Sequence, residues 1–110
     1  VYSNPESSGG SLVYQFEVSE AGRYRVWGRV QAAGDLDDSF WVSMDGGEYA
    51  LWDLEWSDNW LWDPVSDRNG AEYLEFELSA GNHSLTIKQR EDGSKLDKLL
   101  ITDNLTYLPH

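Results

Sequence analysis

The 110-residue sequence contains no cysteine, which excludes a disulfide framework and a metal site built on thiolates. It has two histidines, His83 and the terminal His110, so neither a histidine-based metal site nor a Ser–His–Asp triad fits the pattern. Lysine and arginine total eight against twenty acidic residues, giving a net charge of −12. Phosphate backbones and anionic membranes are bound through clustered basic residues, so we expect neither nucleic acid nor a membrane as a partner.

The sequence also lacks an apolar run long enough to cross a bilayer and a basic-then-apolar leader. Its length fits one domain spanning residues 1–110, with room for an ordinary hydrophobic core. We expect a secreted or cell-surface domain, either mature or excised from a larger secreted protein. The negative charge suits solubility in an extracellular medium, and cation binding or repulsion of polyanions are its other possible uses.

Alternation of apolar and polar residues indicates β-strands throughout, with no convincing helix. The segments that fit strands are 12–18, 23–31, 39–44, 73–78, 83–90 and 96–102. Turn signals such as Asp45-Gly46-Gly47 separate them, and residues 1–10 are expected to be an irregular lead-in. Short strands at near-regular spacing predict an all-β fold, a two-sheet antiparallel β-sandwich.

Two pairing predictions follow from this pattern. If Leu78 pairs with His83, segments 73–78 and 83–90 form a hairpin in which Glu75 and Lys88 are diagonal neighbours. The apolar run Leu99–Ile101 indicates a strand buried on both sides, and therefore a central one.

Four of the six tryptophans fall within residues 51–63, interleaved with acidic residues and an asparagine. No helix or strand period places all four rings on one buried face. Sugars bind flat aromatic faces edged by polar groups, because the C–H face of a pyranose stacks on the ring while polar neighbours take the hydroxyls. The alternative is that these tryptophans plug one end of a small β core, and Trp62 is expected to lie partly in the core.

Candidate ligand-binding residues follow from this stretch. Trp56 and Trp60 are the favoured stacking platforms, and Trp52 is a further candidate contact. Asp58 and Asn59 are candidate acceptors for sugar hydroxyls.

Three segments, residues 21–29 (AGRYRVWGR), 38–46 (DSFWVSMDG) and 78–101, together resemble the β-sandwich carbohydrate-binding modules of families 6, 35 and 36. These modules are galactose-binding-like jelly rolls. The resemblance spans Leu12 to Pro109, and the last segment is the most specific. It implies a non-catalytic domain appended to a secreted polysaccharide-degrading enzyme, with a polysaccharide or oligosaccharide as ligand and a parent enzyme or neighbouring domains as partners.

Such modules hold a structural calcium through a Glu-Ala-Glu-like pair and a late aspartate. The resemblance places that aspartate at Asp97, but no such pair precedes residues 7–10 here. A second candidate for Ca²⁺ is the acidic loop with its closely spaced carboxylates, Asp35, Asp37 and Asp38. Its spacing does not match an EF-hand, and a solvated loop is the alternative.

Asp97 shares strand parity with Leu99, which predicts a carboxylate on a buried face. Such a group must be hydrogen-bonded, paired or metal-bound, and Arg23 or Arg29 could pair with it. Lys95 stands where many family 6 modules carry a sugar-binding asparagine. A lysine there suits a uronate, a sulfate or another acidic sugar group, and an exposed turn lysine is the alternative.

Arg25, Trp27 and Arg29 share the outer face of their strand. They could form a cationic and aromatic strip for an acidic glycan, but cross-strand pairing with carboxylates is the favoured role for the arginines. We therefore predict a non-catalytic carbohydrate-binding module, and an acidic glycan is one possible ligand. The alternative is a structural or adhesive module whose tryptophan stretch packs on a neighbouring domain or chain.

Overall fold

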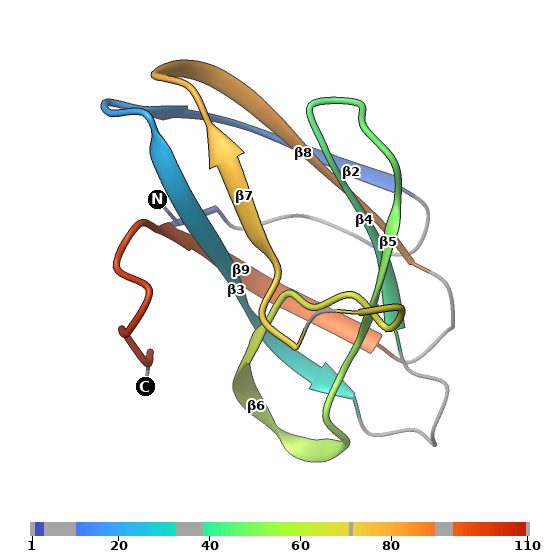
Figure 1. Ribbon diagram of the computed structural model, residues 1–110. Coiled ribbons are helices and arrows are strands. Elements are labelled where there is room, and N and C mark those ends of the chain that lie inside the picture. The colour runs from blue at the N-terminus through green and yellow to red at the C-terminus, as the bar shows by residue number, and fades with distance from the viewer. Residues whose placement is uncertain (1, 4–10, 33–38, 71, 90–93, 110) are drawn as a thin grey trace.

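The computed structural model describes residues 2–3, 11–32, 39–70, 72–89 and 94–109, and in them the chain forms nine β-strands and no helix (Figure 1). The strands are β1 (Tyr2–Ser3), β2 (Ser11–Val18), β3 (Gly22–Ala32), β4 (Ser39–Met44), β5 (Ala50–Asp53), β6 (Ser57–Pro64), β7 (Glu75–Leu78), β8 (Gly81–Gln89) and β9 (Ser94–Thr102). These residues thus contain no helix long and apolar enough to cross a bilayer.

Two antiparallel sheets make up the two layers visible in Figure 1. Sheet A has the order β1-β9-β3-β6, with β7 also pairing with β3, and sheet B has the order β2-β8-β4-β5. This confirms the predicted two-sheet sandwich. It also confirms the central place of β9, which lies between β1 and β3. The expectation of an irregular lead-in is wrong at Tyr2–Ser3, which pairs with Leu99 and Leu100 of β9.

The core lies between the sheets and follows from strand alternation. In β2, Tyr14, Phe16 and Val18 are buried while the residues between them are exposed. Trp52, contributed by sheet B, and Val26, contributed by sheet A, have no exposed surface. Burial of large apolar side chains at about 25 cal/mol per Å² is the main favourable term for a domain of this size.

The predicted hairpin of residues 73–78 with 83–90 is wrong. β7 joins sheet A beside β3, whereas β8 lies in sheet B between β2 and β4. Both strands have one apolar face, and alternation alone does not say which sheet each enters. Glu75 accordingly pairs with Arg25 of β3 at 3.0 Å, and Lys88 lies on the other sheet.

β3 has two successive partners along one edge, and this arrangement shapes the surface around the tryptophans. β7 pairs with its first residues and β6 with its second half, and residues 65–70 and 72–74 lie between these two strands in the sequence. The Val65 N–H donates to the Val26 carbonyl at 2.8 Å, and the Leu74 N–H donates to the Val65 carbonyl at 2.9 Å. The chain therefore makes a short excursion that returns to the same edge.

Candidate functional site

The tryptophan-rich stretch divides between the two sheets. β5 belongs to sheet B and β6 to sheet A, so residues 54–56 cross one end of the sandwich. The four rings therefore have different surroundings: Trp52 is fully buried and Trp62 is half-buried, whereas Trp60 is 37% exposed and Trp56 is 60% exposed.

Trp52 is a core residue. Its indole N–H donates to Asp63 Oδ1 at 2.9 Å, and its ring lies 5.6 Å from that of Phe40. The other oxygen of Asp63 accepts the backbone N–H of Glu55 at 2.9 Å, and burial raises the pKa of Asp63. Because no face of the indole is exposed, Trp52 cannot stack on a ligand and does not belong to the ligand-binding set that the sequence predicted.

A cleft of about 550 Å³ lies on the outer face of sheet A beside Trp60. Its described lining residues are Arg29, Glu55, Trp60, Leu61, Trp62, Lys98 and Pro109. Arg29 lies directly between Trp62 on β6 and Lys98 on β9, so these three side chains share a row on the same face. The Arg29 guanidinium carbon is 5.3 Å from the Trp60 ring centroid, and the Lys98 ammonium is 5.9 Å from that of Trp62. The cleft thus contains two aromatic rings and two basic side chains, together with the carboxylate of Glu55.

A β-bulge changes the position of Asp97. Arg29 pairs with Lys98 but the next residue of β3, Val30, pairs with Leu96, which leaves Asp97 as an extra residue. Its side chain is 38% exposed and accepts a hydrogen bond from Arg29 Nη1 at 2.7 Å. The prediction of a buried face is therefore wrong, because the bulge breaks the two-residue period. The predicted pairing with an arginine is confirmed for Arg29.

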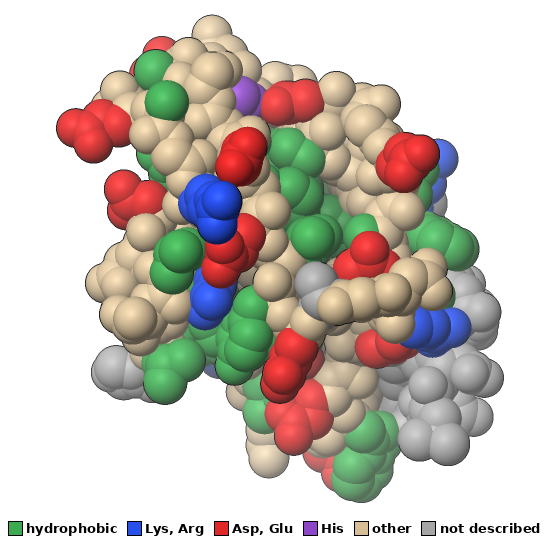
Figure 2. All heavy atoms as spheres, viewed as in Figure 1, with side chains coloured by type: hydrophobic (Ala, Val, Ile, Leu, Met, Phe, Trp, Pro, Cys, Tyr) green, Lys and Arg blue, Asp and Glu red, His purple; other side chains and the backbone are tan. Residues whose placement is uncertain are grey.

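The other half of the β3 outer face is covered. Arg25 donates to Glu75 at 3.0 Å and to the Leu105 carbonyl at 2.6 Å, and its guanidinium lies 4.5 Å from the Tyr73 ring centroid. Trp27 is 4% exposed, with its ring 6.1 Å from that of Tyr73. Figure 2 shows basic side chains against acidic ones over β3 and β7. Arg25 and Arg29 therefore make the cross-strand pairs that the sequence favoured.

The predicted polar residues lie at the same end of sheet A as Trp60. Asp58 and Asn59 are exposed at the start of β6, and the Asp58 carbonyl accepts a hydrogen bond from the side chain of Gln31 on β3. Lys95 is exposed on β9, where it pairs with Gln31 from the other side. The structure thus brings Asp58, Asn59, Trp60 and Lys95 to one end of three neighbouring strands.

Of the predicted calcium ligands, only Asp97 lies among the described residues. Among them, no group of three His, Asp or Glu side chains is placed to hold a metal ion, and Asp97 is engaged by Arg29. The calcium site implied by the family resemblance therefore stays a prediction. The loop residues Asp35, Asp37 and Asp38 lie outside the described residues.

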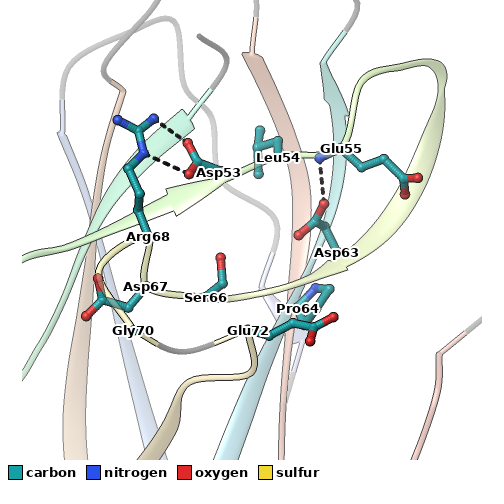
Figure 3. A pocket seen from close by; sticks show the side chains of 10 residues that line it. All are labelled: Asp53, Leu54, Glu55, Asp63, Pro64, Ser66, Asp67, Arg68, Gly70 and Glu72. Atoms are coloured by element: carbon teal, nitrogen blue, oxygen red, sulfur yellow. Dashed lines mark hydrogen bonds and ion pairs between the residues drawn. The ribbon is translucent and has the colours of Figure 1, made fainter. Parts of the chain in front are cut away.

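A second hollow, of about 690 Å³, opens between the β5–β6 connection and residues 66–70 and 72 (Figure 3). Arg68 makes a bidentate pair with Asp53, at 2.9 and 2.5 Å. In Figure 3, Glu55 and Asp67 point to opposite sides of the hollow rather than toward a common point. Its polar groups stabilise the loop, and the hollow offers no converging set of ligand-binding groups.

Sequence reasoning missed Lys98 as a lining residue of the cleft. Strand alternation places Lys98 opposite in direction to the buried Leu99, so its outward orientation was predictable. Its place in a row with Arg29 and Trp62 depends on the register of three strands that are distant in sequence.

No family model matches the chain. A protein from Formosa agariphila with the name "Uncharacterized protein P23" is 28% identical over 123 residues. That alignment covers 98% of this chain and 29% of the relative, so the chain spans less than a third of the relative's length.

Solved structures match over nearly the whole chain. The GH26-CBM35 β-(1,4)-mannanase of Podospora anserina matches with a TM-score of 0.70 and 17% identity, over 94% of this chain and 22% of that one. A family 35 module, Xyl-CBM35, solved in complex with a disaccharide containing glucuronic acid, matches with a TM-score of 0.63 and 16% identity, over 92% and 72%. The described chain therefore has the β-sandwich fold of the family 35 carbohydrate-binding modules, in agreement with its resemblance to modules of the family 6 and 35 type.

Proposed function

We propose that this chain is a non-catalytic carbohydrate-binding module that binds a polysaccharide or oligosaccharide at the β6 end of sheet A. Trp60 and Trp56 stack on sugar rings, and Asp58, Asn59 and Lys95 contact hydroxyl or acidic groups. The observation that carries the proposal is the exposed Trp60 ring at an aromatic cleft in a chain with the fold of family 35 modules.

The position of Trp60 suits a stacking platform. The Arg29 guanidinium lies over its ring, and Asp97 in turn pairs with Arg29, so the ring belongs to a connected cluster. A ring that is held in this way loses little conformational freedom when a ligand binds, which favours affinity. Trp56 lies on the segment that crosses between the sheets, adjacent in sequence to the cleft residue Glu55, and is the most exposed tryptophan among the described residues.

Charge supports an acidic glycan as the ligand. Three of the eight basic residues, Arg29, Lys95 and Lys98, lie on the β3–β9 half of this region, where Asp97 pairs with Arg29 and Glu55 also lines the cleft. Lysine ammonium groups donate hydrogen bonds to carboxylate or sulfate oxygens. The related Xyl-CBM35 was solved with a disaccharide containing glucuronic acid, which is consistent with a uronate-bearing ligand.

The role of such a module is targeting. In the P. anserina mannanase a domain of this fold forms a small part of an enzyme, and a secreted or surface-bound parent protein is the matching context here. Each stacked ring contributes about 1 kcal/mol, so a single site binds weakly and attachment relies on neighbouring modules.

Titration of tryptophan fluorescence against glucuronoxylan, polygalacturonate and β-1,4-mannan tests the proposal. We expect a saturable change with an acidic glycan, and an affinity about fivefold lower in each of the single variants Trp60→Ala and Trp56→Ala. Lys95→Gln is expected to lower the affinity for the acidic glycans and to leave the affinity for neutral mannan unchanged. Arg23→Gln is the matched charge control, because Arg23 is exposed on β3 and pairs with Glu77 away from the cleft. Unchanged affinity in both tryptophan variants would refute the assignment of the site.

The alternative is a module for protein interaction, since exposed tryptophan is also enriched at protein interfaces. The position of Trp56 at the end of the sandwich, 60% exposed, is the observation that favours it. A concentration-dependent dimer in gel filtration that protects Trp56 from quenching, together with no response to any glycan, would establish this alternative.

A further inference from the structure

The segment that follows β9 turns back beside sheet A and reaches the proposed glycan site. The last residue of β9 pairs with Arg25 of β3, and Pro109 lines the cleft together with Arg29, which lies four residues further along β3. Between these two points, the Leu105 carbonyl accepts a hydrogen bond from Arg25 at 2.6 Å. Residues 103–109 therefore run from one end of β3 toward the cleft, and Figure 1 shows the chain turning at the end of β9.

Arg25 holds this segment through contacts on several sides of its guanidinium. Nη1 donates to the Leu105 carbonyl, and Nη2 donates to Glu75 at 3.0 Å. The flat group also lies 4.5 Å from the centroid of the Tyr73 ring. The side chain is 20% exposed, so these contacts are largely shielded from water, which strengthens them. The planar fork of an arginine suits this arrangement, and a lysine cannot reproduce it.

The segment is also folded on itself around Leu105. The side-chain oxygen of Asn104 accepts hydrogen bonds from the N–H of Thr106 at 3.2 Å and from its hydroxyl at 3.0 Å. The Asn104 carbonyl accepts the Tyr107 N–H at 3.2 Å, and the Asn104 N–H donates to the Thr102 hydroxyl at 3.0 Å. These bonds restrict the backbone on both sides of Leu105, so a preformed turn presents the carbonyl that Arg25 binds.

Pro109 is the point at which the segment meets the cleft. It is half-buried and lines the cleft together with Trp62 and Lys98. Its ring carries no N–H and presents only C–H groups, which suit the apolar face of a sugar ring. Because Pro109 lies outside the strands, its position depends on the contacts that hold the segment.

We infer that Pro109 forms a wall of the glycan cleft and that Arg25 is a positioning residue for this wall, acting through the Leu105 carbonyl and not through the ligand. The inference rests on the proposed function, because it concerns the same cleft. A wall that is held before the ligand arrives does not have to be ordered on binding, so the contacts of Arg25 contribute to affinity from outside the cleft. The bound glycan in turn stabilises the docked segment, since coupling between two equilibria is reciprocal.

Affinities of two variants test the wall and the positioning role. Oligosaccharides cut from glucuronoxylan, polygalacturonate and β-1,4-mannan are titrated by calorimetry into each protein. Arg25→Lys keeps the charge but loses the planar fork, and we expect it to bind about threefold to fivefold more weakly than the wild type. Pro109→Gly removes the wall itself and should lose about the same factor.

A control and a further variant make the comparison specific. Arg23→Lys is the matched control, because Arg23 lies two residues earlier on β3, is 64% exposed and pairs with Glu77, and it should bind like the wild type. Asn104→Ala keeps the test decisive if Arg25→Lys does not fold, because Asn104 is exposed and its side chain holds only the turn. We expect Asn104→Ala to weaken binding by about threefold.

Chymotrypsin digestion gives a readout that a purely structural role of Arg25 would not move. The bond after Tyr107 lies in the docked segment, and its cleavage requires the segment to leave the sheet. We expect Arg25→Lys to be cut there about threefold to fivefold faster than the wild type, and a bound oligosaccharide to slow this cut in the wild type. Mass spectrometry identifies the product that ends at Tyr107.

The outcomes separate this inference from the proposed function. Wild-type affinity in Pro109→Gly would refute the wall, and wild-type affinity in both Arg25→Lys and Asn104→Ala would refute the positioning role. Weaker binding in these variants without glycan protection of the Tyr107 bond would assign the loss to the fold and overturn the inference. In each of these cases the proposed function stands if Trp60→Ala binds more weakly than the wild type. Absence of binding in the wild type would overturn both.

Discussion

Replacing Gly28 by alanine should destabilise this protein well beyond an ordinary surface change. Gly28 is buried in β3 beneath the indole of Trp52. A Cβ added there would lie 3.2 Å from Leu96 Cδ1 and from Trp52 Cζ2, and closer still to Trp52 Cη2. Heavy atoms do not approach this closely without displacement, so the ring or the strand must move.

Trp52 has little freedom to move. It is fully buried, its N–H is bonded to Asp63, and its ring packs against Phe40. Overpacking of a core costs about 1–3 kcal/mol, and the constraint on Trp52 places Gly28→Ala in the upper half of that range. For a loss of about 2 kcal/mol, the urea midpoint falls by roughly 1 M at a slope near 2 kcal/mol/M, and Tm falls by about 10 °C.

Urea unfolding followed by circular dichroism measures this loss, with Gly22→Ala as the matched control. Gly22 lies on the same strand but is exposed, and the nearest atom to its added Cβ, Tyr24 Cε2, is at 3.9 Å. That control should leave stability unchanged, or raise it by up to about 1 kcal/mol, because alanine lowers the conformational entropy of the unfolded chain. Equal midpoints for the two variants would refute the packing of Trp52 against Gly28.

Two further predictions concern buried polar contacts. Both ring nitrogens of His83 lie 2.6 Å from acceptor oxygens, of the Ser79 carbonyl and the Asp45 carboxylate, and these contacts raise the pKa of His83. Only the imidazolium donates to both, so its stabilisation is present below the ordinary pKa of 6.5 and is lost as pH rises through the raised value. Urea midpoints of His83→Gln and wild type should therefore differ more near about pH 6 than near about pH 9, and a constant difference would contradict this. Asp63→Ala removes the acceptor of the Trp52 N–H and of one backbone N–H, and should cost about 2–3 kcal/mol in the same assay; a loss under about 0.5 kcal/mol would contradict the buried bonds.

The alternation of apolar and polar residues was sufficient to predict the class of fold. It identified most of the strands, the inward residues of β2, and the central place of β9 through the run Leu99–Ile101. This succeeds because a strand in either layer of a sandwich must present one apolar face to the core. The resemblance of residues 78–101 to known modules added the jelly-roll type, which the solved structures support.

The place of each strand in the two sheets depended on tertiary structure. Residues 73–78 and 83–90 look alike as amphipathic segments, yet one pairs with β3 and the other with β2 and β4. Alternation describes the faces of a strand and carries no information about its partner. A partner is chosen by contacts between residues that are distant in sequence.

The same limit applies to the candidate site. The sequence singled out the tryptophan stretch, but it could not separate the buried Trp52 from the exposed Trp56 and Trp60. That separation arises because the chain passes from sheet B to sheet A between Asp53 and Ser57. The bulge at Asp97 likewise redirects a carboxylate that a two-residue period places in the core. The sequence by itself determined which residue types and which strand faces were available, and only the tertiary structure decided which of them meet, because register and sheet membership are set by long-range pairing.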